Sequence, residues 1–179
     1  MVQITFKGHS ALPDLVRVAE CYEELAGDRL MPHRSEFSAS RFRWMVGRMY
    51  LIDVLDGGGD YRLRLWGDFL QVVYGLAVTG QRLSELELEG QRPSTALRQH
   101  YNVIVASKAP LFQPGAAVWP NGACIQYQRL MLPFADDEGR VSLILGAVAS
   151  NVSNEDLVFF RGLGSPSFVL GDRVPDETV

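Results

Sequence analysis

Segments with strand character are grouped along this chain, and segments with helical periodicity lie between the two groups. Strands are expected at 48–55, 61–65, about 112–119, 123–134 and 140–149. A long helical segment runs from about Ser94 to Ser107 and separates the first two strands from the last three. A doubly wound parallel sheet would alternate strands with helices. The order therefore predicts an α+β fold: a five-stranded antiparallel sheet, with helices inserted between strands 2 and 3 covering one face.

The alternation of residues 61–65 predicts a strand with two different faces. Tyr61, Leu63 and Leu65 fall on one face, and Arg62 and Arg64 fall on the other. The glycine-rich run 56–60 before it predicts a turn, which makes 48–65 a hairpin. Residues 141–149 are apolar on both faces, so that strand should be central in the sheet.

An amphipathic helix is predicted at the N-terminal end, over residues 13–26. Its apolar positions recur at spacings of three and four, and Gly27 suits its end. An apolar stripe of this kind must cover something, either the sheet of the same domain or a second copy of the chain. We expect a homodimer or output surface on this helix, formed by Leu15, Val18, Tyr22 and Leu25.

Composition indicates one folded domain. The chain has 179 residues, 47% of them hydrophobic and 21% charged, and 17 basic against 21 acidic residues give a net charge of −4. This balance argues against nucleic-acid binding through bulk positive charge. The chain shows neither a signal peptide nor a run of apolar residues long enough to cross a membrane, so a cytoplasmic protein is expected. We divide the single domain, 1–179, into a helical flank (13–47), a core (48–149) and a C-terminal extension (150–179).

Motifs for metal binding or nucleophilic catalysis are not found in the sequence. The histidines are isolated, and the two cysteines, Cys21 and Cys124, lie far apart. We therefore expect a protein that is not an enzyme and has no metal site. The alternative is a small cone-shaped α+β enzyme of the isomerase or dehydratase kind, which would use His100 with a nearby carboxylate, Asp53 or Asp68, as an acid–base pair.

Apolar and aromatic side chains could line a ligand pocket between the sheet and the helices. The candidates are Leu63, Leu65, Tyr74, Tyr101, Ile104, Tyr127, Met131 and Leu143. A filled core would use the same residues. Arg64 and Arg129 lie in expected strands, and an arginine on the covered face needs an anionic partner. That partner could be a carboxylate or phosphate of a ligand or an acidic side chain of the protein; an exposed outer face is the third alternative.

The order and spacing of several short segments resemble PAS domains, and in particular a bacterial family of stand-alone PAS-like proteins common in alphaproteobacteria. The matching segments are Pro32–Phe37, Tyr61–Gly67, Tyr74–Gly75 followed by Thr79–Gly80, Ser107–Pro110, and Tyr127–Pro133 leading to Ile144–Gly146. The resemblance covers about residues 30–149. The chain departs from it at Asp68, where the family has threonine, and at Ala77 and Val78, where an acidic residue precedes Thr-Gly.

The resemblance implies a sheet whose concave face is covered by helices and senses a small molecule or a partner helix. It implies a sensory or interaction module in bacterial signal transduction that acts through a partner protein. Some haem-binding PAS sensors carry a proximal histidine on the helix where His100 stands, but we favour a histidine bonded to a neighbour or to water. Flavin-cysteinyl PAS sensors carry a cysteine just before the long helix, and residues 90–93 contain none. The cofactor is left open.

Overall fold

One antiparallel sheet organises the computed structural model, which describes residues 4, 10–74, 78–88, 94–153 and 155–170. Its six strands are β1 (Met49–Leu55), β2 (Asp60–Trp66), β3 (Leu111–Val118), β4 (Cys124–Ala135), β5 (Val141–Ser150) and β6 (Ser167–Leu170). Their order in the sheet is β2-β1-β5-β4-β3-β6. The expected first five strands are all present, and β5 lies between β1 and β4 with both faces buried, as its apolar sequence predicted.

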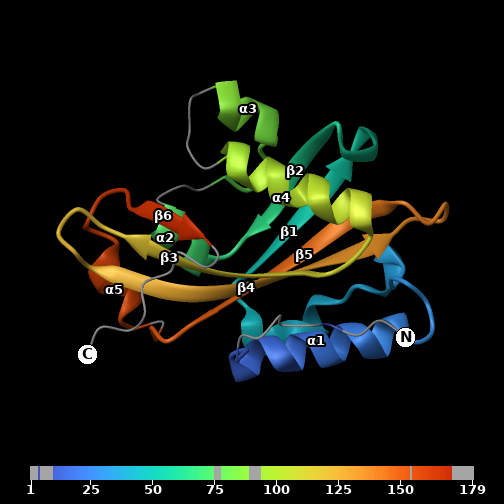
Figure 1. Cartoon of the computed structure of the whole chain (residues 1–179), viewed down its shortest axis with the longest axis horizontal. Coiled ribbons are helices and arrows are strands. Elements are labelled where there is room, and N and C mark those ends of the chain that lie inside the picture. The colour runs from blue at the N-terminus through green and yellow to red at the C-terminus, as the bar shows by residue number, and fades with distance from the viewer. Residues whose placement is uncertain (1–3, 5–9, 75–77, 89–93, 154, 171–179) are drawn as a thin grey trace.

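Helices cover both faces of the sheet (Figure 1). They are α1 (Pro13–Ala26), α2 (Asp68–Tyr74), α3 (Leu83–Leu88), α4 (Ser94–Ser107) and α5 (Leu157–Phe160), with 3₁₀ turns η1 (Arg34–Glu36), η2 (Ala39–Met45) and η3 (Asp56–Gly58). The helices inserted between β2 and β3 are α2, α3 and α4, and α4 and α1 lie on opposite sides of the sheet. Within the described residues, no helix is long and apolar enough to cross a membrane.

Two hydrophobic cores result, one on each face of the sheet. Side chains of β4 alternate between them: Met131 packs on the side of α2 and α4, and Leu130 and Leu132 pack on the side of α1. Strand β5 alternates in the same way, because Ile144 faces α2 and α4 whereas Leu143 faces α1. The period of two in these strands therefore ties both cores to one set of backbone hydrogen bonds.

The apolar stripe of α1 is buried against the sheet of its own chain. Leu15, Val18 and Tyr22 are 0% exposed, and Leu25 packs on the same core. The Tyr22 hydroxyl donates a hydrogen bond of 2.6 Å to the backbone oxygen of Pro133. The prediction that these four residues form a dimer or output surface is wrong. Strands β4 and β5 are apolar on both faces, and α1 is the element that keeps the second face from water.

Within the described residues the sheet has six strands, so the prediction of five is wrong by one. Strand β6 pairs antiparallel with β3, with Ala116 opposite Val169. It is only four residues long, and such a run is too short to show a periodicity in the sequence. It belongs to the C-terminal extension, in which no strand was expected.

Candidate functional site

A buried arginine lies at the centre of the face covered by α4. Arg129 of β4 is 3% exposed, and the pairing of β3 with β4 places Gln113 directly opposite it. Arg129 Nε donates to Gln113 Oε1 at 3.1 Å, Nη2 donates to the same oxygen, and Nη2 also donates to His100 Nδ1 at 2.9 Å. None of these partners is a carboxylate, and the described residues provide Arg129 with no ion pair.

His100 of α4 is neutral at physiological pH. Burial lowers the pKa of His100 to about 4, and the charge of Arg129 acts in the same direction. Because a guanidinium can only donate, the unprotonated nitrogen of the ring is Nδ1 and the proton is on Nε2. That proton points toward Gln113 Nε2, 3.1 Å away, which is also a donor. Rotating the amide by 180° would move the mismatch to Arg129, so this trio holds one more donor than it can pair.

Tyrosine side chains surround the guanidinium. Tyr50, Tyr74, Tyr101 and Tyr127 all interact electrostatically with Arg129. The hydroxyls of Tyr50, Tyr101 and Tyr127 are buried and have no partner in good hydrogen-bond geometry within the described residues, although that of Tyr50 lies near Arg129 and that of Tyr127 lies near Tyr74. Burial raises the pKa of each of these three hydroxyls, so they remain protonated and uncharged. The indole Nε1 of Trp66 is a further buried donor, and it has no hydrogen-bond partner among the described residues.

Two glycines make room for two of the tyrosine rings. Gly146 of β5 lies opposite Tyr50, and Gly115 of β3 lies opposite Tyr127. A Cβ atom on Gly146 would lie 1.9 Å from Tyr50 Cζ, and one on Gly115 would lie 2.6 Å from Tyr127 Cζ. Each ring therefore lies across the backbone of the neighbouring strand, in space that only glycine leaves open.

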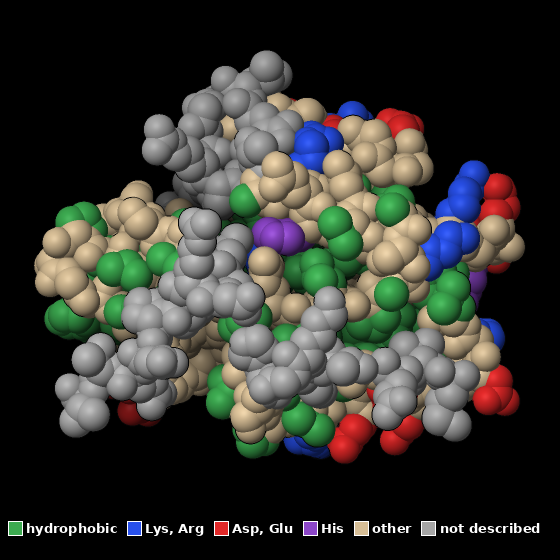
Figure 2. All heavy atoms as spheres, in the orientation of Figure 1, with side chains coloured by type: hydrophobic (Ala, Val, Ile, Leu, Met, Phe, Trp, Pro, Cys, Tyr) green, Lys and Arg blue, Asp and Glu red, His purple; other side chains and the backbone are tan. Residues whose placement is uncertain are grey.

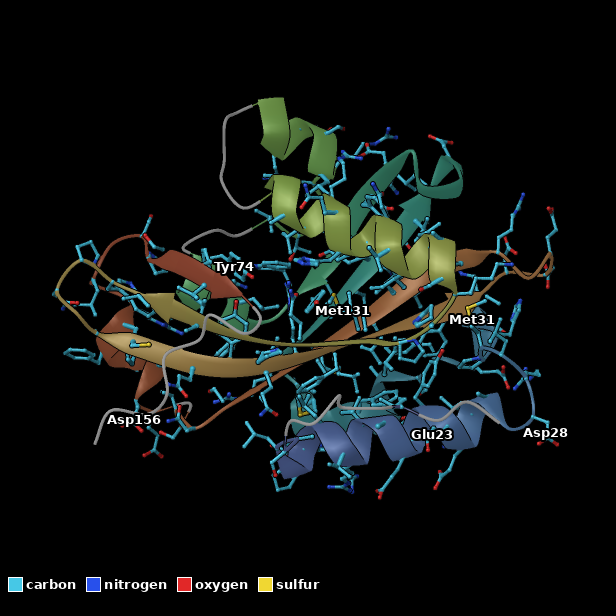
Figure 3. The ribbon with its side chains drawn as sticks, viewed as in Figure 1. Glu23, Asp28, Met31, Tyr74, Met131 and Asp156 are labelled. Atoms are coloured by element: carbon cyan, nitrogen blue, oxygen red, sulfur yellow. The ribbon has the colours of Figure 1, made fainter. Side chains whose placement is uncertain are left out.

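A small pocket lies beside this cluster. It is lined by Tyr50, Trp66, Phe69, Leu70, Val73, Tyr74, Leu97, Tyr127, Arg129 and Val148. Its free space accommodates about one water molecule. Tyr74, labelled in Figure 3, comes from α2, and its ring stacks on Phe168 of β6 with 4.5 Å between centroids. Strand β6 thus supports one wall of the pocket. Apart from Arg129 and the tips of the aromatic rings, the walls are apolar.

The structure places most of the predicted lining residues on this side of the sheet. Tyr74 and Tyr127 line the pocket itself, and Leu63, Tyr101, Ile104 and Met131 belong to the surrounding core. The prediction for Leu143 is wrong, because Leu143 faces α1 on the other side of the sheet. The sequence showed that both faces of β5 are apolar, but it did not show which residues face which helices.

The prediction for Leu65 is also wrong, because a β-bulge interrupts the alternation of β2. Leu51 pairs with Leu65, whereas the next residue, Ile52, pairs with Leu63. Arg64 is therefore the extra residue, and Leu65 is 37% exposed and belongs to neither core. The Arg64 side chain is 57% exposed and lies 3.8 Å from the carboxylate of Asp53.

Three important side chains of the site were not singled out from the sequence: Gln113, Tyr50 and Trp66. Gln113 would have followed from the register of β3 and β4, since it stands opposite Arg129. Tyr50 and Trp66 are paired residues of β1 and β2. Nothing in the sequence distinguishes either from an ordinary core aromatic residue.

The surroundings of His100 bear on the two alternatives that involve it. Both ring nitrogens face protein atoms, Arg129 Nη2 and Gln113 Nε2, so neither points to the place of a haem iron. Among the described residues no carboxylate bonds to His100, and Asp53 pairs instead with Arg34 at 3.3 Å. The described residues therefore do not form the acid–base pair that the enzyme alternative requires. The described residues also contain no cluster of three potential metal ligands.

Comparison with known proteins gives the family. A family model described as a PAS domain matches residues 11–149. The search of curated proteins found no match. Among solved structures, the PAS domain of Bordetella pertussis BvgS is 21% identical, with 62% of this chain and 81% of that chain covered and a TM-score of 0.40. The dark structure of the Aureochrome1 LOV photoreceptor is 13% identical, with 70% and 90% covered and a TM-score of 0.42.

The family match includes α1, all of β1 to β4 and all of β5 except its last residue, Ser150, and it ends before α5 and β6. It spans well over half of the 179 residues. The chain belongs to the PAS domain family.

Proposed function

We propose that this chain is a sensory PAS module that binds a small molecule in the pocket between α2, α4 and the sheet. PAS domains are in general sensory or ligand-binding signalling modules. One observation carries the proposal. Three residues that line the same pocket, Tyr50, Tyr127 and Trp66, each have a buried polar atom without a hydrogen-bond partner among the described residues. Leaving such an atom unpaired costs about 1–3 kcal/mol. A core selected only for stability would have apolar residues here, so the polar atoms indicate a ligand.

The response to the ligand would be a change in helix packing. The pocket accommodates only about one water molecule, so a ligand of several atoms has to move α2 or α4 away from the sheet. A ligand that binds the open arrangement better than the closed one shifts the population toward it. We infer that a partner protein in bacterial signal transduction reads this shift.

The surface through which a partner protein detects this change in helix packing would lie away from the buried stripe of α1. Figure 2 shows one face of the molecule, with charged side chains gathered at the edge near the turn between β4 and β5. There Arg140 pairs with Asp136 and Glu138 at 3.0 and 2.8 Å. A partner protein or a second copy of the chain would use surface outside α1's buried stripe, and exposed apolar side chains such as Val158 and Phe159 of α5 are available for it.

Native mass spectrometry of the purified full chain tests the proposal. The expected result is extra mass that is lost on denaturation, or a compound in a small-molecule panel that raises the unfolding midpoint. Val73→Phe fills the pocket and should abolish either signal, because Val73 is a buried lining residue. Val46→Phe is the matched control, because Val46 is 66% exposed. The proposal fails when neither signal is seen, or when Val73→Phe leaves it unchanged.

A further inference from the structure

We infer that the ligand of this pocket is a small organic acid whose carboxylate lies against Arg129 and whose body is apolar. The inference rests on the proposed function and adds to it the chemical class of the ligand. It is carried by two features of the site, an unbalanced buried charge and a set of buried hydrogen-bond donors that have no acceptor within the described residues.

The charge of Arg129 is not balanced within the described residues. Its hydrogen-bonding partners are the amide of Gln113 and the imidazole of His100, which is neutral. The phenols of Tyr50, Tyr101 and Tyr127 are uncharged as well, because burial raises the pKa of each. Burying a cation without a counter-ion is costly, and an anion entering this pocket would remove most of that cost.

Several hydrogen-bond donors of the site also have no acceptor placed to pair with them within the described residues. A guanidinium has five N–H groups, and the bonds from Nε and Nη2 use three of them, which leaves the two on Nη1. Trp66 Nε1 can only donate, and the hydroxyls of Tyr50 and Tyr127 can donate too. A carboxylate consists of two oxygens that only accept, so it complements this set. A neutral amide would bring N–H donors, for which neither the guanidinium of Arg129 nor the indole of Trp66 offers an acceptor.

The walls of the pocket favour a carboxylate over a phosphate. One guanidinium provides a single positive charge, whereas a phosphate group at neutral pH carries more negative charge and three acceptor oxygens. The remaining contacts are with apolar side chains, among them Phe69, Leu70, Val73 and Leu97. These match an aliphatic or aromatic body attached to one carboxylate.

The test compares carboxylates with their neutral amides on the full chain. Sodium formate, acetate, butyrate and benzoate are titrated at constant ionic strength against sodium chloride, alongside formamide, acetamide, butyramide and benzamide. Thermal unfolding and tryptophan fluorescence report binding. We expect at least one carboxylate to bind about tenfold or more tightly than its amide, since charge-assisted bonds to Arg129 are lost in the amide. Arg129→Met should abolish this preference, and Arg64→Met, at an exposed arginine, should retain it.

Each other outcome overturns the inference in a recognisable way. If amides bind as tightly as carboxylates, or chloride raises the unfolding midpoint as much as every carboxylate does, the carboxylate assignment is wrong while the pocket of the proposed function stands. If no compound binds in a way that Val73→Phe blocks, both fail. The comparison of carboxylates with amides uses the unmodified protein, so it remains decisive if Arg129→Met does not fold.

Discussion

At the scale of single residues, Arg129 is better suited to binding than to stability. A buried charge whose partners are neutral adds little to folding, and its replacement by a hydrophobic residue of similar volume is often neutral or stabilising. Without Arg129, the Gln113 amide can turn so that its oxygen accepts a hydrogen bond from His100 Nε2, which removes the mismatch between donors.

We therefore predict that Arg129→Met changes the free energy of unfolding of the ligand-free protein by less than about 1 kcal/mol, or stabilises it. Arg98→Met is the comparison, because it leaves the carboxylate of Asp60 without the guanidinium 3.3 Å away. That variant should lose about 1–3 kcal/mol in urea denaturation. A loss of about 3 kcal/mol or more for Arg129→Met would show that Arg129 is mainly structural.

The histidine beside Arg129 predicts a loss of stability in acid. Burial lowers the pKa of His100 to about 4 in the folded protein, against about 6.5 in the unfolded chain. Between these values the unfolded chain binds more protons, so stability is complete above about pH 6.5 and falls as the pH drops to about 4. His100→Gln should abolish this part of the loss, about 1–2 kcal/mol after allowing for the partial exposure of the ring. Urea titrations of both proteins from about pH 4 to 8 check it; a constant difference across that range contradicts it.

At the scale of helices and strands, the sequence predicted what depends on periodicity and missed what depends on register. The ends of α1 and α4 and the first five strands follow from local patterns of apolar residues. The bulge that exposes Leu65 does not, because it is set by the pairing of β1 with β2. The assignment of Leu143 to a face, and the meeting of Gln113 with Arg129, likewise depend on which residues pair across strands.

Strand β5 provides a test of how the tyrosine rings are held. Gly146→Ala would place a Cβ 1.9 Å from Tyr50 Cζ, so the ring or the strand has to move. We predict a loss of about 2–3 kcal/mol in the free energy of unfolding, the upper part of the range of about 1–3 kcal/mol expected for overpacking. Gly162→Ala is the control, because a Cβ added there would have no atom within 4 Å, and it should change stability by less than about 0.5 kcal/mol. Equal effects of the two variants would contradict this account.

Helix α1 provides a second test at this scale. Leu15→Glu would place a charge in the core between α1 and the sheet, so we predict a loss of about 3–5 kcal/mol with the oligomeric state of the folded protein unchanged. Val16→Glu, one residue later and 36% exposed, should have little effect. Light scattering and urea denaturation measure the two quantities. A lower molar mass at unchanged stability would instead identify α1 as a subunit interface.

At the scale of the whole molecule, the two cores share one sheet. Successive residues of β4 point alternately to the pocket side and to the α1 side, so neither core can lose its packing while the strand keeps its place. The sequence did not decide what covers the second face of the sheet, because α1 could pack either on this sheet or on a second copy of the chain. The structure decides between those alternatives, because α1 packs on β4 and β5 of its own chain.

This arrangement predicts that both faces unfold in one transition, and the tryptophans can report each face separately. Of the three in the chain, Trp44 packs on the α1 side, and Trp66 and Trp119 lie on the side of α2 and α4. Trp44→Phe leaves reporters on the pocket side only, and the double variant Trp66→Phe/Trp119→Phe leaves one on the α1 side only. For each variant, the midpoint in urea by fluorescence should coincide with that by far-ultraviolet circular dichroism, as expected for a single cooperative unit.

Leu132→Ala, which opens a cavity on the α1 side, should lower the stability reported from the pocket side by about 2–5 kcal/mol as well. If Leu132→Ala shifts only the signal of Trp44, the cores are independent, and a ligand under α4 could not influence the α1 side through the sheet.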